Sequence, residues 1–172
     1  MIPDIKKILY ATDLSTNSAY AFSYAINMAL KYDAEIIVLH VFEPIRLTPP
    51  NIMTSYLSME DSEKIIEEKI VDARKRVNNR ITLCRDNEFN GDSAITERVK
   101  AIVVIEGYPA EDIIRMADES NCDAIVMGTH GKGVLMQTFL GSTTKKVLRR
   151  VRKPVFIVPL PKEEIDLSLD DF

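Results

Sequence analysis

Cysteine is scarce in this chain of 172 residues, and its two copies, Cys84 and Cys122, form no CxxC pair and have no neighbouring histidine. Zinc sites and disulfide frameworks both need clustered or regularly spaced cysteines. The sequence therefore predicts neither kind of site, and this cysteine usage is typical of the reducing cytoplasm.

Long apolar runs and an excess of positive charge are also missing. No stretch approaches the roughly 18 uninterrupted apolar residues of a membrane helix, and residues 1–7 carry charges where a secretory signal would be apolar. The net charge is −4, which argues against a nucleic-acid partner despite a basic run at 145–153. We therefore expect an untargeted cytoplasmic protein with no membrane and no nucleic-acid partner.

Short apolar segments alternate with amphipathic ones along the chain. Five segments rich in aliphatic and β-branched residues predict buried strands at 8–11, 35–41, 99–105, 123–127 and 155–158. Apolar residues at spacings of three and four predict helices from Ser15 or Asn17 to Lys31, and at 58–79, 109–120 and 142–150. A weaker strand-like piece covers 80–84.

Three segments lack these patterns. Thr48-Pro49-Pro50-Asn51 can neither continue a helix nor pair in a central strand, so 46–57 is interpreted as a mobile excursion or lid. The polar stretch 85–93 predicts a turn or insertion around Asn90-Gly91. The acidic tail 161–172 has no core pattern and is expected to be disordered, which leaves a single domain over 1–160.

This alternation predicts an α/β fold, a three-layer open twisted sheet of five parallel strands with helices on both faces. In such sheets ligands lie at the carboxyl ends of the strands, near the point where the strand order switches. Asp13, Val41, Gly107 and Gly128 fall at those ends.

The segment 128–143 contains neither GxxxxGK[ST] nor GxGxxG, so the P-loop and dinucleotide fingerprints are both absent. Gly128 and Gly131 follow a strand, and Gly141-Ser142-Thr143 opens a helix. Glycine lets backbone N–H groups approach an anion, and a helix N-terminus attracts one. Spacing alone leaves two interpretations open: a phosphate-binding loop, or a strand-exit turn followed by an ordinary N-cap at Ser142.

Gly-x-x-Gly, nine residues and Gly-Ser resembles the nucleotide-binding signature of the universal stress protein family. MGTHGKG followed by GSTTKKVLRRVRKPVFIVP resembles the C-terminal block of that family, and KKILYATDLSTNSAYAFSYAINMA resembles its first strand and helix. LHVFEP and VIEGYPAEDIIRMADESNCDAIVMG resemble its middle segments, so the similarity extends over about 6–159, although 46–93 has little of the family pattern.

The resemblance implies an adenine nucleotide alpha hydrolase-like, Rossmann-like fold that binds ATP, or AMP or another adenine nucleotide, with Mg²⁺ or Mn²⁺ held through the phosphates. It implies nucleoside contacts from Asp13 and from the Val41 backbone, and a ribose contact from Gly128. It places His130 close by and assigns phosphate binding to Gly131, Gly141, Ser142 and Thr143. It also implies a homodimer through 155–158.

Simpler roles remain open for the same residues, because Asp13 could cap the first helix, Val41 could be a core residue and His130 a surface residue. The functions considered are a nucleotide-dependent regulatory module, a slow ATPase or nucleotidyl-transfer enzyme on the same fold, and an interaction module that binds no nucleotide. The regulatory module, with no catalytic residue, is preferred because the phosphate-binding loop opposite an adenine edge that it requires is present. The enzyme is disfavoured because no acidic cluster near the loop supplies Mg²⁺ ligands and a residue to orient the nucleophile.

Overall fold

The computed structural model describes residues 4–44, 59–129 and 140–159. The expected excursion at 46–57 and the acidic tail at 161–172 lie outside these ranges. The strands are β1 (Lys7–Thr12), β2 (Glu35–Phe42), β3 (Val99–Glu106), β4 (Ala124–Gly128) and β5 (Val155–Val158). The helices are α1 (Thr16–Tyr32), α2 (Met59–Glu88), α3 (Ala94–Arg98), α4 (Pro109–Glu119) and α5 (Ser142–Arg150).

The five strands form one parallel sheet in the order β3-β2-β1-β4-β5. The chain therefore builds outward from β1 through β2 to β3, and then returns to add β4 and β5 on the other side of β1. This reversal places the switch in strand order between β1 and β4, which pair from Ile8 opposite Ala124 to Ala11 opposite Met127. The predicted open parallel α/β sheet of a single domain is confirmed.

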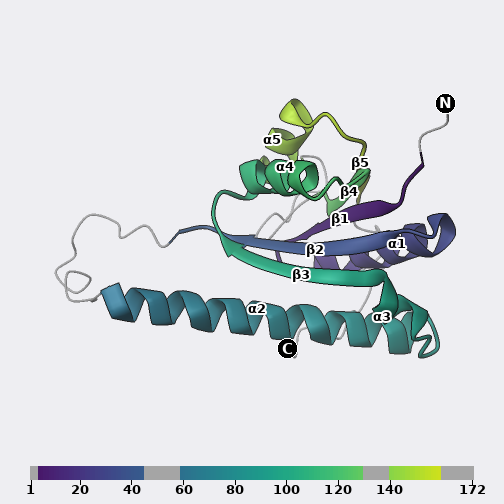
Figure 1. The fold of residues 1–172 in the computed structure, drawn as a ribbon, viewed down its shortest axis with the longest axis horizontal. Helices are drawn as coiled ribbons and strands as arrows, with labels where there is room; N and C mark the ends of the chain where they lie inside the picture. The colour runs from purple at the N-terminus through teal and green to yellow at the C-terminus, as the bar shows by residue number, and fades with distance from the viewer. Residues whose placement is uncertain (1–3, 45–58, 130–139, 160–172) are drawn as a thin grey trace.

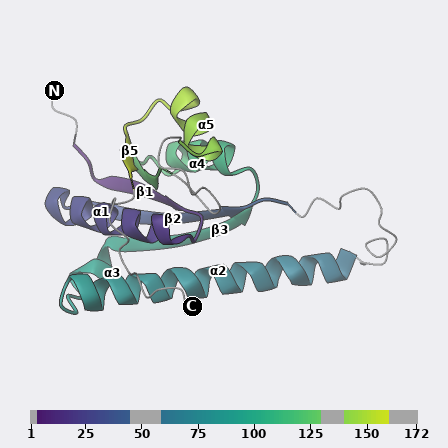
Figure 2. The same ribbon diagram turned by 180° about the vertical axis from the view of Figure 1, so that it is seen from behind.

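Helices cover both faces of the sheet, as the two opposite views show (Figures 1 and 2). Successive side chains of a strand point to opposite faces, so each strand serves two cores. On one face Ile8, Tyr10 and other buried strand residues pack with α1, α2 and α3. On the other face Leu9 and Ala11 pack with α4 and α5. The predicted three-layer arrangement follows from this division.

The long helix α2 corrects the sequence interpretation. The expected helix at 58–79 continues to Glu88, so the strand predicted at 80–84 is wrong. Ala73, Val77, Ile81 and Cys84 are all buried, at the spacings of three and four that one helix face requires. The β-branched residues of this piece had suggested a strand, but packing against α1 and β3 outweighs that local preference.

The segment expected as a turn or insertion at 85–93 divides into two parts. Its first four residues form the end of α2, and the chain reverses only after Glu88. Asn90 and Gly91 both have positive φ, 53° and 78°, a conformation that these two residue types adopt readily. The unpredicted short helix α3 follows and buries Ile95 completely. Among the described helices, none is long and apolar enough to cross a bilayer.

Candidate functional site

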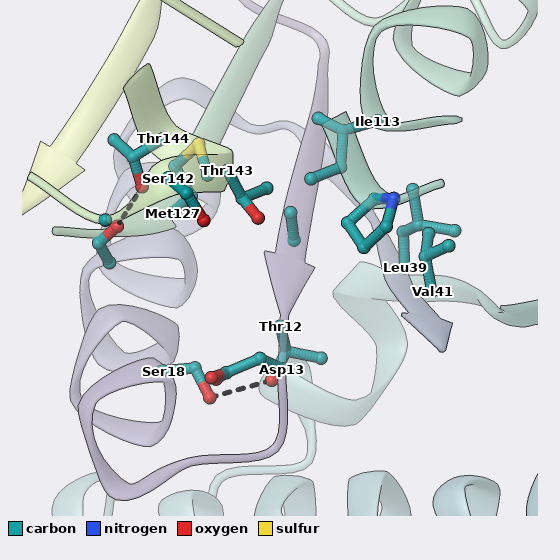
Figure 3. Close-up of a pocket in the computed structure, with 14 residues that line it drawn as sticks. Thr12, Asp13, Ser18, Leu39, Val41, Ile113, Met127, Ser142, Thr143 and Thr144 are labelled. Atoms are coloured by element: carbon teal, nitrogen blue, oxygen red, sulfur yellow. Dashed lines mark hydrogen bonds between the residues drawn. The ribbon is translucent and has the colours of Figure 1, made fainter. Parts of the chain in front are cut away.

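A cavity of about 260 Å³ opens at the carboxyl ends of β1, β2 and β4, where the strand order switches. This volume lies just below the range of about 300–1,000 Å³ that is usual for ligand pockets. The cavity therefore has room for much of a small organic ligand. Figure 3 shows labelled side chains approaching it from three directions, two of them mainly polar and one apolar.

The first polar side is the β1–α1 loop. The Asp13 carboxylate accepts hydrogen bonds from the backbone N–H and the hydroxyl of Ser15, at 3.0 and 2.6 Å. Ser15 is the N-cap of α1, and its side chain accepts from the Ser18 N–H. The alternative in which Asp13 caps this helix is therefore wrong. Asp13 instead orders the turn before the cap, and it lines the cavity beside Thr12 and Ser18.

The second polar side joins the end of β4 to the start of α5. The Thr144 hydroxyl donates to the Gly128 carbonyl at 3.1 Å, and the Gly141 N–H donates to the Thr129 carbonyl at 2.8 Å. The N-cap of α5 is Gly141, which has no side chain to occupy the N–H groups of the first turn. Together with the helix dipole, these N–H groups and the hydroxyls of Ser142 and Thr143 can hold an anion.

The third side is apolar and comes from β2 and α4. Leu39, Val41 and Ile113 face the cavity opposite Ser142 and Thr143, and Pro109 also lines it. Such a surface suits a flat, weakly polar ring. Next to Leu39, the buried His40 donates from Nδ1 to the Thr12 carbonyl at 2.8 Å and so ties β2 to the end of β1.

Burial also shifts the pKa values of two ionisable groups next to the β1–α1 loop, Tyr10 and Arg80. It raises the pKa of Tyr10 to about 12, and the Tyr10 hydroxyl donates to the Ser18 carbonyl. It lowers the pKa of the Arg80 guanidinium, which is half-buried on α2 and interacts electrostatically with Tyr10 and Asp13. A desolvated cation therefore lies close to the cavity.

Six of the eight residues predicted from the sequence line the same cavity: Asp13, Val41, Gly128, Gly141, Ser142 and Thr143. The other two, His130 and Gly131, lie outside the described residues. The sequence interpretation missed the other lining residues, namely Ala11, Thr12, Ser18, Leu39, Pro109, Ile113, Met127 and Thr144. Position beside a strand end could have indicated Thr12, Pro109 and Met127, whereas Ser18 and Ile113 depend on how the helices pack.

The strand order and the cavity at its switch point define the class of protein: a Rossmann-like α/β domain with a ligand pocket at the carboxyl ends of its strands. The model of the universal stress protein family matches residues 4–159. The chain therefore belongs to the universal stress protein family.

Individual relatives agree with this assignment. Universal stress protein MJ0577 of Methanocaldococcus jannaschii is 31% identical over 157 residues, which cover 89% of this chain and 94% of the relative. A solved structure of MJ0577 matches with a TM-score of 0.66 and 28% identity over 92% of this chain and 99% of that one.

Two further solved structures share the fold and contain nucleotides. A universal stress protein in complex with cAMP matches at a TM-score of 0.51 and 21% identity, over 91% of this chain and 98% of that one. The protein from Archaeoglobus fulgidus in complex with dAMP matches at 0.55 and 20%, over 88% and 96%.

Proposed function

We propose that this protein binds an adenine nucleotide in the described cavity, with ATP as the first candidate and AMP as the second, and acts as a nucleotide-dependent regulatory module in a stress response. The observation that carries the proposal is the arrangement of the cavity, in which an apolar wall lies opposite a helix N-terminus whose N-cap residue is a glycine, Gly141. The two cysteines of the protein are free and buried, which suits a protein that acts in the cytoplasm.

Each part of the nucleotide has a matching part of the cavity. The base would pack on the apolar side formed by β2 and α4, with the Val41 backbone at its edge. Asp13 would accept a hydrogen bond from the ribose, and Gly128 would allow the sugar to pass close to the chain. The phosphates would extend to Gly141, Ser142 and Thr143, where the dipole of α5 favours negative charge.

A divalent cation fits this arrangement. Among the described residues no group of three or more histidine, cysteine or acidic side chains could hold the ion, so the phosphate oxygens, which are hard ligands of the kind that Mg²⁺ and Mn²⁺ prefer, would hold it. We propose that such an ion arrives with the phosphates and neutralises part of their charge. His130 and Gly131 are proposed to complete the phosphate-binding side from the segment between β4 and α5.

Known relatives support the class of ligand. The cAMP and dAMP complexes show that the same fold accommodates adenine nucleotides in other proteins. The family match connects this chain to them over nearly its whole length.

Calorimetric titration with ATP tests the proposal. Wild-type protein is expected to bind, and Gly141→Val is expected to bind about tenfold more weakly or worse, because bulk at the N-cap displaces the phosphates. Ser142→Ala should weaken ATP by about tenfold through the loss of one charge-assisted hydrogen bond. Thr96→Ala, exposed on α3, is the matched control and should bind like wild type. Failure of wild type to bind any adenine nucleotide at millimolar concentration would overturn the proposal.

Two further measurements define the ligand and its fate. Protein purified without added nucleotide, then denatured, should release an adenine nucleotide that chromatography and mass spectrometry identify as ATP or AMP. A regulatory module should show single-turnover hydrolysis of labelled ATP no faster than the buffer control. Faster turnover would favour the enzyme interpretation.

We also propose that the protein forms a homodimer through β5. This strand is last in the sheet order, so one of its edges has no neighbour within the described sheet. Phe156 on β5 is 43% exposed, and its ring lies 6.0 Å from that of Tyr24, which is 39% exposed. These adjacent aromatic rings and the strand edge would meet their copies across a twofold axis.

A further inference from the structure

The β1–α1 loop has an unusual backbone conformation directly after Asp13. Leu14 has a φ of 64°, in the left-handed region that leucine rarely adopts, and its side chain is buried. A conformation of this kind persists only where surrounding groups hold it in place. The groups that hold Leu14 therefore also determine where Asp13 lies.

Local contacts hold part of this loop, including the Ser15 carbonyl, which accepts from the Ala19 N–H at 3.1 Å and from the Ser18 hydroxyl at 2.8 Å. The Leu14 N–H donates to the Thr12 hydroxyl at 3.1 Å, and Asp13 holds Ser15. The Leu14 carbonyl, by contrast, accepts from two side chains of α2, more than sixty residues further along the chain.

Arg80 on α2 donates to both carbonyls. Its Nη2 donates to Leu14 O at 2.6 Å and to Ser15 O at 2.9 Å, and its Nη1 donates to the hydroxyls of Thr12 and Ser18 at 3.2 and 3.0 Å. One turn earlier, Arg76 donates to the same Leu14 carbonyl at 3.2 Å. The planar guanidinium of Arg80 therefore donates to four acceptors between the end of β1 and the first turn of α1.

The packing of α2 against the sheet does not depend on these hydrogen bonds from Arg80 and Arg76. The helix already buries an apolar stripe that includes Ala73, Val77 and Ile81 against the sheet. Arg80 adds a half-buried cation, which is costly to desolvate unless it is well paired. Two of its partners, Thr12 and Ser18, line the cavity, whereas Arg80 does not.

We infer that Arg80, assisted by Arg76, is a positioning residue for nucleotide binding, which holds the β1–α1 loop so that Asp13 and Thr12 face the nucleoside. This inference rests on the proposed function. It makes the long helix α2 part of the binding machinery without direct contact with the ligand.

The experiment compares ATP and adenosine binding by calorimetry, at a temperature where circular dichroism shows each variant folded. Arg80→Met should weaken both ligands by the same factor, about tenfold, because the loop contacts their shared nucleoside. Arg80→Lys should lie between, since an ammonium can reach only part of the four acceptors. Arg74→Met, exposed on the same helix, is the matched control and should leave both affinities unchanged. Ser142→Ala should weaken ATP but not adenosine.

The outcomes separate the two proposals. ATP binding within twofold of wild type by folded Arg80→Met would overturn the positioning role and leave the proposed function standing. The positioning role would also be overturned if Arg80→Lys and Arg80→Met lost the same amount of affinity and both changed the ratio of ATP to adenosine affinity. If Arg80→Met does not fold, Arg80→Lys and Arg76→Met decide, and unchanged adenosine affinity in both would refute the inference. Absence of binding by wild type would overturn both proposals.

Discussion

At the scale of single residues, Gly107 has no room for a side chain. A Cβ added there would lie 2.1 Å from Asp112 Oδ2 and 3.0 Å from Asp112 Cγ. Asp112 cannot move without loss, because its Oδ2 accepts from the Tyr108 N–H at 2.7 Å at the start of α4. The turn that leads from β3 into α4 therefore depends on glycine.

Gly107→Ala is expected to displace the Asp112 carboxylate and lower the free energy of unfolding by about 1–2 kcal/mol, the usual value of a helix-capping contact. In a domain of this size that corresponds to a decrease in melting temperature of about 2–8 °C. Thermal denaturation followed by circular dichroism measures it.

Asp112→Ala supplies the control for this substitution. Without the carboxylate, the added methyl group of Gly107→Ala has no close neighbour, so the double variant should be scarcely less stable than Asp112→Ala alone. Additive losses would contradict the proposed clash.

At the scale of elements, β5 carries a prediction about assembly. Phe156→Glu should convert the proposed dimer to a monomer, because a carboxylate cannot be buried beside Tyr24 without a partner. Sedimentation at micromolar concentration measures the change. Val71→Glu, at an exposed apolar position on α2, is the matched control and should remain dimeric. A monomeric wild type would refute the dimer.

The same scale shows which elements could be predicted from the sequence. The strands and α5 were predictable because each short apolar run is bounded by polar or glycine residues, as at Thr12-Asp13 and Gly141-Ser142. The end of α2 was not, because Ile81 and Cys84 look like part of a strand until their burial against α1 and β3 is known. Local preference is decided there by tertiary packing.

The candidate site likewise contains residues that could be predicted from the sequence and residues that could not. Asp13 and Gly141 were predictable because they lie at a strand end and a helix start and match a family signature. Arg80 and Ile113 were not, because their relation to the cavity depends on how α2 and α4 lie across the sheet. Nothing in the sequence near Arg80 distinguishes it from the exposed Arg74.

At the scale of the whole molecule, three buried groups on both faces of the sheet link stability to alkaline pH. Burial raises the pKa of Cys84 from 9.0 to about 12, of Cys122 from 9.0 to about 11, and of Tyr10 from 10.0 to about 12. The folded chain therefore keeps protons that the unfolded chain releases. Their contribution to stability is complete below about pH 9 and is lost as the pH rises towards 12.

The free energy of unfolding is expected to fall between pH 9 and 11, by up to about 1.4 kcal/mol per pH unit for each group that is ionised only in the unfolded chain. Urea denaturation at pH 8, 9, 10 and 11 measures the slope. Cys84→Ala should make the slope shallower than that of wild type. A free energy independent of pH over this range would contradict the burial of these groups.

The contacts from Arg80 to Leu14 and Ser15 also bear on synthesis. The loop after the first strand leaves the ribosome early, but the guanidinium that fixes its shape is translated more than sixty residues later. The helix start at Gly141 comes later still. During synthesis the first strand and Asp13 are therefore present long before Arg80 and the start of α5. The cavity is complete only in the finished polypeptide.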